Sequence, residues 1–196
     1  MRPPRPCVLI VCEGEKTEPT YFKDLRRDRR LSAAEVEICG KECASHPRLV
    51  VDYALKRKRE EKRAKLPYDS VWCVFDQDDH KKIEEALIRA RDNEIQVAFS
   101  NPCFELWYLL HFEYSTAERH RDAVVSLLKN GHLPGYDKSE SVYHSLLEHQ
   151  ECATQNAGRL RQHHSTAGNK ETQNPSTSVD RLVTDLNSLA DRQAAN

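Results

Sequence analysis

The sequence predicts an α/β protein built on an open, mostly parallel sheet with helices on both faces, followed by a C-terminal helical extension. Two observations lead to this class. Short apolar runs typical of buried strands alternate with amphipathic helical segments in the first part of the chain. Only helical patterns follow them. We therefore expect an α/β core at residues 1–113 and a helical extension packed on it at residues 114–196.

The strands of the core are predicted from their apolar patterns. Continuous apolar runs at residues 7–12 and 70–75 are typical of strands buried on both faces of a parallel sheet. Residues 95–99 are predicted as another strand. Val36 and Ile38 alternate with glutamates, which indicates a more exposed strand.

Helices are predicted where apolar residues recur at helical spacing. The predicted helices lie after Pro19, from Pro47 to before Pro67, at residues 80–92, 101–111, 116–130 and 140–162, and after an N-cap at Thr177. The polar stretch at residues 163–176 carries few apolar side chains and is predicted to be a loop.

Composition favours a cytoplasmic protein without a membrane partner. No apolar run reaches the roughly 20 residues that a membrane-spanning helix needs, and no signal-type segment follows the N-terminus. The 7 cysteines include no C-x-x-C pair, which argues against a disulfide framework. A zinc site built from Cys39, Cys43 and His46 is an alternative, although no fourth ligand is evident at a suitable spacing.

The most informative stretch is an apolar strand that ends in acids. Asp76 and Asp78 follow the strand predicted at residues 70–75, and burying two such carboxylates is costly unless a cation neutralises them. Glu13 follows the first buried strand, and ligands of open α/β sheets bind beyond the carboxyl ends of strands. If the two strands are neighbours, these three acids form a site for Mg²⁺ or Mn²⁺. The alternative is a turn or helix cap, a role that Asp79 could fill by itself.

Three further residues are candidates for the same site. Lys16 lies just beyond Glu13, where it could contact a phosphate or stabilise a leaving oxygen. Lys138, in a turn-rich loop, is a second candidate for this role. Glu105 interrupts an otherwise apolar helix, and a half-buried carboxylate there needs a partner. It could orient metal ligands or pair with an arginine or lysine.

Residues 56–65 carry 7 basic side chains among 10 residues. One interpretation is a solvated helix face on which acids and bases pair at helical spacing. The other is a surface that binds phosphates of a nucleic acid. The sequence leaves both interpretations open.

Four segments, at residues 11–22, 76–80, 100–107 and 174–179, resemble the RloB-like proteins in the same order along the chain. Within them, Glu13-Gly14 and Asp76-x-Asp78 look like the Toprim motif of topoisomerases, bacterial primases and related nucleases. The resemblance implies a Toprim-like (Rossmann-like) fold and a role in bacterial antiphage defence. It also implies metal-dependent cleavage of nucleic acid, with Glu13, Asp76 and Asp78 as the matching acids.

We therefore predict a Mg²⁺-dependent nuclease that acts on DNA or RNA. Glu13 would be a metal ligand or a general base. Nucleotidyl transfer of the primase type at the same metal site is one alternative. A non-catalytic subunit that binds nucleic acid or a partner ATPase is another. The sequence contains no P-loop, so any nucleotide-driven step would come from such a partner. A homodimer is an open option for its assembly.

Overall fold

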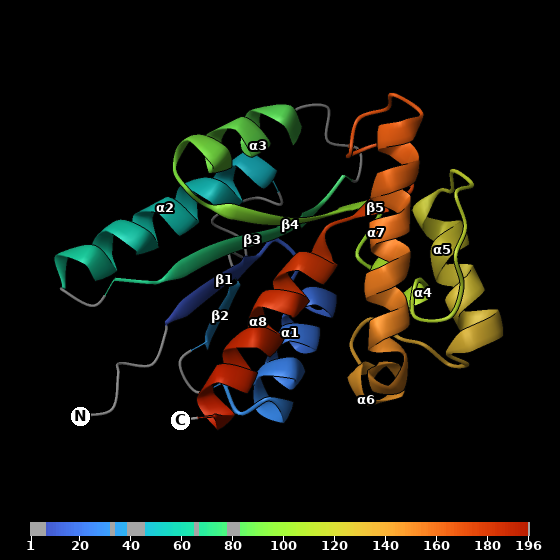
Figure 1. Ribbon diagram of the computed structural model, residues 1–196, viewed down its shortest axis with the longest axis horizontal. Helices are drawn as coiled ribbons and strands as arrows, with labels where there is room; N and C mark the ends of the chain where they lie inside the picture. The colour runs from blue at the N-terminus through green and yellow to red at the C-terminus, as the bar shows by residue number, and fades with distance from the viewer. Residues whose placement is uncertain (1–6, 32–33, 39–45, 65–66, 78–82, 196) are drawn as a thin grey trace.

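The computed structural model describes residues 7–31, 34–38, 46–64, 67–77 and 83–195. Within these residues, five strands form one open sheet in the order β2-β1-β3-β4-β5 (Figure 1). The strands are β1 (Val8–Cys12), β2 (Ala34–Ile38), β3 (Ser70–Asp76), β4 (Gln96–Asn101) and β5 (Ser176–Thr177). All neighbouring strands pair in parallel except β4 and β5, which are antiparallel. The predicted open, mostly parallel sheet is confirmed, and it is consistent with a Rossmann-like or Toprim-like fold.

Helices cover both faces of this sheet (Figure 1). They are α1 (Thr17–Asp28), α2 (Pro47–Arg63), α3 (Ile83–Asp92), α4 (Glu105–Leu109), α5 (Arg121–Leu127), α6 (Tyr143–Leu146), α7 (Gln150–Thr166) and α8 (Val179–Ala194). A π-helical turn, Leu128–His132, continues α5, and a 3-10 turn, Leu147–His149, joins α6 to α7. The helices α2 and α3 lie on one face, and α1 and α8 lie on the other.

The alternation of side chains along the strands creates two apolar cores. Leu9 and Val11 of β1 belong to the smaller core, which α2 and α3 cover. Val8 and Ile10 point to the opposite face and belong to the larger core, which includes α1, α8 and the helices between α4 and α7. Residues of the predicted extension therefore share one apolar core with the sheet. The boundary predicted at residue 113 stays a prediction.

The helical part departs from the expected pattern at three places. The helix predicted at residues 116–130 begins only at Arg121. The helix predicted at residues 140–162 is divided by the 3-10 turn. Helix α7 then continues to Thr166, into the predicted loop, because His164 is buried and its Nε2 lies 2.9 Å from the carbonyl oxygen of Pro175. This buried contact is long-range, so local polarity could not reveal it.

The C-terminal segment also joins the sheet, which the sequence did not predict. Thr177 of β5 pairs with Ser100 of β4. The N-cap residue of α8 is Ser178 and not Thr177 as predicted. The hydroxyl of Ser178 accepts a hydrogen bond from the Phe99 amide at 2.9 Å and donates one to the Val97 carbonyl at 3.1 Å. Ser178 thus supplies the contacts of one more strand residue along the edge of β4.

Cys12, Cys73 and Cys103 are fully buried, and burial raises the pKa of each thiol. Cys39 and Cys43 of the alternative zinc site lie outside the described residues, and the imidazole of His46 accepts a hydrogen bond from Arg48 at the start of α2. None of the described helices is long and apolar enough to cross a membrane.

His111 is an ionisable group inside the larger core. It is 1% exposed, and its Nδ1 donates to the Trp107 carbonyl at 2.8 Å. Burial lowers the pKa of His111 to about 4. Because the unfolded chain has a histidine pKa of about 6.5, the unfolded state binds more protons between these two values. The stability that depends on neutral His111 is therefore fully present above about pH 6.5 and is lost as the pH drops towards about 4.

We predict that His111→Gln flattens this pH dependence. The free energy of unfolding of the natural chain should fall by about 3 kcal/mol more than that of the variant between pH 6.5 and 4. Urea unfolding at a series of pH values measures the difference. His144→Gln, at an exposed position, is the control and should keep the natural slope. Equal slopes in the two variants would contradict the assignment to His111.

Candidate functional site

A pocket opens at the carboxyl ends of β1 and β3. Its volume is about 290 Å³. The lining residues are mostly charged, and they are Glu13, Gly14, Glu15, Lys16, Thr17, Glu18, Asp76, Phe104, Glu105, Arg121 and Lys138. The pocket therefore brings together five of the six residues predicted from the sequence. The sixth, Asp78, lies outside the described residues.

Glu13 and Asp76 come together because β1 and β3 are neighbours. The parallel register sets Cys12 opposite Val74, and the Glu13 amide donates to the Val74 carbonyl at 2.9 Å. Asp76 is the last residue of β3 and is 8% exposed. Its Oδ2 accepts a hydrogen bond from the Phe104 amide at 3.0 Å, so the turn before α4 fixes the carboxylate in one orientation. The expected adjacency of the two strands is confirmed.

Glu18, at the start of α1, is another acid of this pocket. The side chain is 7% exposed, and its carboxylate lies directly against Gly14. A Cβ atom at position 14 would stand 2.3 Å from Oε2 of Glu18, which is closer than two such atoms approach. The Glu18 carboxylate can therefore occupy this position because residue 14 is a glycine. A glycine four residues before Glu18 was the feature of the sequence that could have indicated this contact.

The acids suit a hard cation in kind. Glu13, Glu18 and Asp76 offer only oxygen donors, which is the ligand type of Mg²⁺ and Mn²⁺ rather than of a structural zinc ion. Within the part of the chain that the structure describes, no three His, Cys, Asp or Glu side chains are close enough to hold a metal ion by themselves. Asp78 stays the predicted third ligand.

Glu105 has the partner that its buried position requires. The carboxylate is 2% exposed, and its Oε1 lies 2.8 Å from Nζ of Lys138. Tyr136 donates a hydrogen bond to the same oxygen at 3.2 Å. Burial acts to raise the pKa of Glu105, but the hydrogen bond and charge of Lys138 outweigh it, so this pKa lies below its ordinary value. Burial likewise raises the pKa of Tyr136, which keeps its hydroxyl protonated as a donor.

The carboxylate of Glu105 in turn holds Lys138 at the pocket. Burial acts to lower the pKa of Lys138, but the hydrogen bond and charge of Glu105 raise it above its ordinary value. The ammonium group therefore stays charged at neutral pH. Lys16 and Arg121 add two more cations to the lining. Arg121 was not predicted, because it begins α5 far along the chain and no local pattern relates it to the acids.

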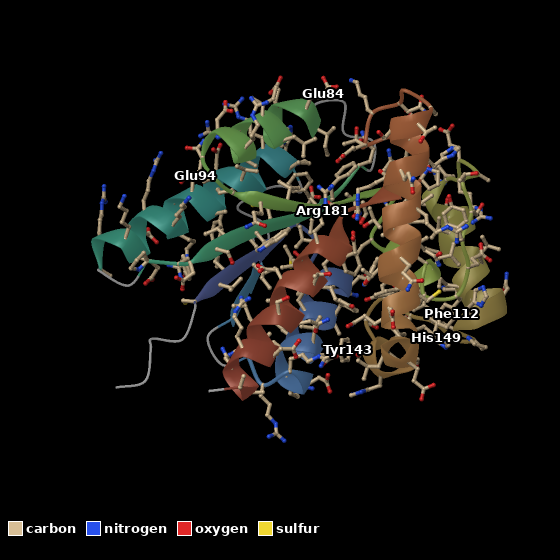
Figure 2. The ribbon with its side chains drawn as sticks, in the orientation of Figure 1. Glu84, Glu94, Phe112, Tyr143, His149 and Arg181 are labelled. Atoms are coloured by element: carbon tan, nitrogen blue, oxygen red, sulfur yellow. The ribbon has the colours of Figure 1, made fainter. Side chains whose placement is uncertain are left out.

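The described part of the basic run, residues 56–64, lies towards the other end of the strands. Lys58 donates to the carbonyl of Asn93 at 2.9 Å, just before β4 begins, and Arg57 donates to the hydroxyl of Tyr68, just before β3. Glu94, which lies 3.8 Å from Lys58, marks this region in Figure 2. The run therefore borders the amino ends of the strands, whereas the pocket lies at their carboxyl ends. Arg57 also pairs with Glu60, as the solvated-face interpretation expects.

The fold and the pocket define an α/β protein with a Rossmann-like sheet and charged residues gathered at its carboxyl edge. The family model described as RloB-like protein matches residues 8–186. The chain therefore belongs to the RloB-like family, and the resemblance drawn from its four segments is confirmed. Searches of curated proteins and of solved structures found no significant match.

We predict that Lys138→Met destabilises the protein by leaving the Glu105 carboxylate buried without its cation. The free energy of unfolding at pH 7 should fall by about 1–3 kcal/mol. Without Lys138, burial raises the pKa of Glu105, so acid protonates it and the loss should shrink as the pH falls from 7 to about 4. Denaturant unfolding at both pH values measures this. Adding Glu105→Gln should recover part of the loss at pH 7. Lys56→Met, at an exposed position of α2, should change the stability little. Additive losses in the double variant would contradict the coupling.

We also predict that Gly14→Ala displaces the carboxylate of Glu18. The end of a glutamate side chain can move, so the free energy of unfolding should fall by only about 1 kcal/mol. Combining Gly14→Ala with Glu18→Ala should remove most of that loss, since the clash disappears. Gly158→Ala in α7 is the control, because its Cβ would meet no atom nearer than 4.0 Å. Thermal unfolding of the four variants tests the prediction, and full additivity at positions 14 and 18 would refute it.

Proposed function

We propose that the protein is a metal-dependent nuclease that cleaves phosphodiester bonds of DNA or RNA. The observation that carries the proposal is the pocket in which Glu13 and Asp76 meet three basic side chains. Acids that can hold a divalent cation and bases that can neutralise a phosphate are the two requirements of phosphodiester cleavage. Membership of the RloB-like family agrees with it.

The acids of the pocket would hold the metal ion. We assign Asp76 and Asp78 to this role, and Glu13 acts as a further ligand or as the general base that accepts a proton from water. A bound Mg²⁺ or Mn²⁺ supplies charge neutralisation at the phosphate and lowers the pKa of water. In this assignment the metal ion would bind Asp76 through Oδ1, while Oδ2 accepts the hydrogen bond from the Phe104 amide.

The bases of the pocket would bind and orient the phosphate. Lys138 is fixed by its ion pair with Glu105, so little side-chain freedom is lost when a phosphate arrives. Lys16 stands at the start of α1, and Arg121 at the start of α5. Arg121 can form two parallel hydrogen bonds to phosphate oxygens, whereas the lysines act as point charges. Together they stabilise negative charge that builds up on the phosphate and on the leaving oxygen.

The biological setting is proposed from the family resemblance. It favours a role in bacterial antiphage defence, with a partner ATPase supplying any nucleotide-driven step. The choice between DNA and RNA depends on contacts with the sugar, and the pocket residues described above act on phosphate.

We predict that Asp76→Asn reduces cleavage of DNA or RNA by about 100-fold or more, because it removes the charge of a metal-holding carboxylate. Asparagine keeps an oxygen that can accept from Phe104, so the fold should survive. Labelled single-stranded DNA and RNA, incubated with Mn²⁺ or with a chelator, give the cleavage rates. The same variant should lose the increase in thermal stability that Mn²⁺ gives the natural protein.

Asp92→Asn, at an exposed position on α3, is the matched control and should leave both readouts unchanged. Equal cleavage by the natural protein and Asp76→Asn would remove the catalytic role of the pocket. Incorporation of labelled nucleotides in place of chain shortening would instead establish nucleotidyl transfer. Binding of nucleic acid that is insensitive to chelator, with no cleavage, would establish a non-catalytic subunit.

A further inference from the structure

A line of basic side chains runs along the exposed face of α1. Lys16, Lys23, Arg27 and Arg30 are exposed, and Thr20 lies partly exposed among them. Thr20, Lys23 and Arg27 lie within α1 at spacings of three and four residues, which keeps them on one side of the helix. Lys16 is the N-cap residue of α1, and Arg30 follows its C-cap residue. We name Lys16, Lys23, Arg27 and Arg30 the α1 cation row.

The far end of the α1 cation row borders a hollow. This hollow has a volume of about 570 Å³ and is lined by Lys23, Arg26, Arg27, Arg30 and Leu31. Arg27 pairs with Asp24 at 3.0 Å, yet its side chain stays 79% exposed. Among the described residues, no ion pair engages Lys23 or Arg30. Four cations around one hollow repel each other, so an anionic partner would relieve a cost that the folded chain carries by itself.

Arg30 occupies a backbone position that favours glycine. Its φ is +52°, and the amides of Arg30 and Leu31 donate to the carbonyls of Arg27 and Arg26, which closes the end of α1. The chain places Gly168 at the equivalent position after α7, with φ +71°. The end of α1 thus carries a cation in a conformation that glycine adopts at less cost.

The near end of the α1 cation row is the pocket. Lys16 lines the pocket beside Glu13, and Lys23 lines the hollow. The 12 residues of α1, which lie between Lys16 and Arg30, span about 18 Å at the rise of an α-helix. That length matches about five nucleotides at the spacing of a stacked strand. The basic run on α2, by contrast, lies on the opposite face of the sheet and near the amino ends of its strands.

We propose that the α1 cation row and its hollow bind the phosphate backbone of one nucleic-acid strand and lead it to the pocket. This inference rests on the proposed function for the phosphodiester that enters the pocket. A strip of cations about as wide as one helix, with Arg26 beside the row at the hollow, fits one backbone. The partner is thus a single strand of DNA or RNA, held mainly by charge.

The experiment measures binding in the presence of a chelator, so that cleavage plays no part. Fluorescence anisotropy follows labelled single strands of three, six and twelve nucleotides, as both DNA and RNA. We expect affinity to rise steeply from three to six nucleotides. The variant Lys23→Gln/Arg27→Gln/Arg30→Gln should bind the twelve-nucleotide strand about tenfold or more weakly, and its dependence on log salt should lose about two units of slope.

The matched control removes one lysine and two arginines from the exposed face of α2, as Lys56→Gln/Arg59→Gln/Arg63→Gln. It should bind within about twofold of the natural protein. Equal weakening in both triple variants, or none in the first, overturns the proposal. Binding of a polyglutamate peptide as tight as that of the nucleic acid also overturns it, since the row would then be a general polyanion site.

A second variant guards against misfolding of the first. Arg30→Gly suits the backbone, so it should keep or raise the melting temperature while it weakens binding. Glu94→Gly repeats the change after α3, where φ is +55°, and should leave binding unchanged. Normal binding by Arg30→Gly would overturn the role of Arg30. Binding without cleavage by the natural protein would reject the proposed nuclease activity and support strand binding by the α1 cation row. Cleavage by the natural protein, with unaltered binding by the triple variant, would support the nuclease activity and reject strand binding by the row.

Discussion

The parallel pairing of β1 with β3 sets Cys12 opposite Val74, and the rest of the pocket is built around this register. Trp72 and Val74 face the larger core, and Asp76 continues the alternation, so its carboxylate turns towards the Phe104 amide before α4. A slip of one residue would carry Asp76 to the face that α2 and α3 cover. The apolar side chains of β3 prevent this slip, since every one of them would exchange cores. The core thereby determines where the acid lies.

Buried charge is the second organising element of the pocket. Glu105 is nearly inaccessible, yet Lys138 and Tyr136 satisfy one oxygen of its carboxylate. The pair also joins α4 to the loop that follows the π-helical turn, because its two members come from those segments. Arg161 and Asp180 repeat this arrangement at a distance from the pocket, where a two-armed ion pair at 2.7 Å joins α7 to α8. Tyr143, labelled in Figure 2, adds a hydrogen bond to Asp28 of α1. The helices are thus joined to one another by polar contacts as well as by the core.

The sequence predicted those features that follow from local pattern or from a general rule of α/β sheets. Strands β1 and β3 were visible as apolar runs and β2 as an alternation, and the rule for carboxyl ends placed Glu13 near Asp76. Glu105 was recognised as an acid in need of a partner, and Lys138 as a base near the site, but not as each other's partner. That pairing depends on how a loop folds over α4. Arg121 was missed for the same reason, because its position also depends on contacts between distant segments. Strand β5 has 2 residues, which is too short to show alternation. Asp78 stays a prediction.

The contact of Ser178 with β4 has a consequence for the solution behaviour of the chain. A parallel sheet of apolar strands offers unpaired amides and carbonyls along its outer strand, where another chain can add itself. Thr177 and Ser178 occupy that edge of β4 by pairing with Ser100 and with the backbone of Phe99 and Val97. If α8 detaches, this protection leaves with it, and the exposed edge becomes a template for aggregation. The last helix therefore protects the solubility of the protein while it closes the larger core.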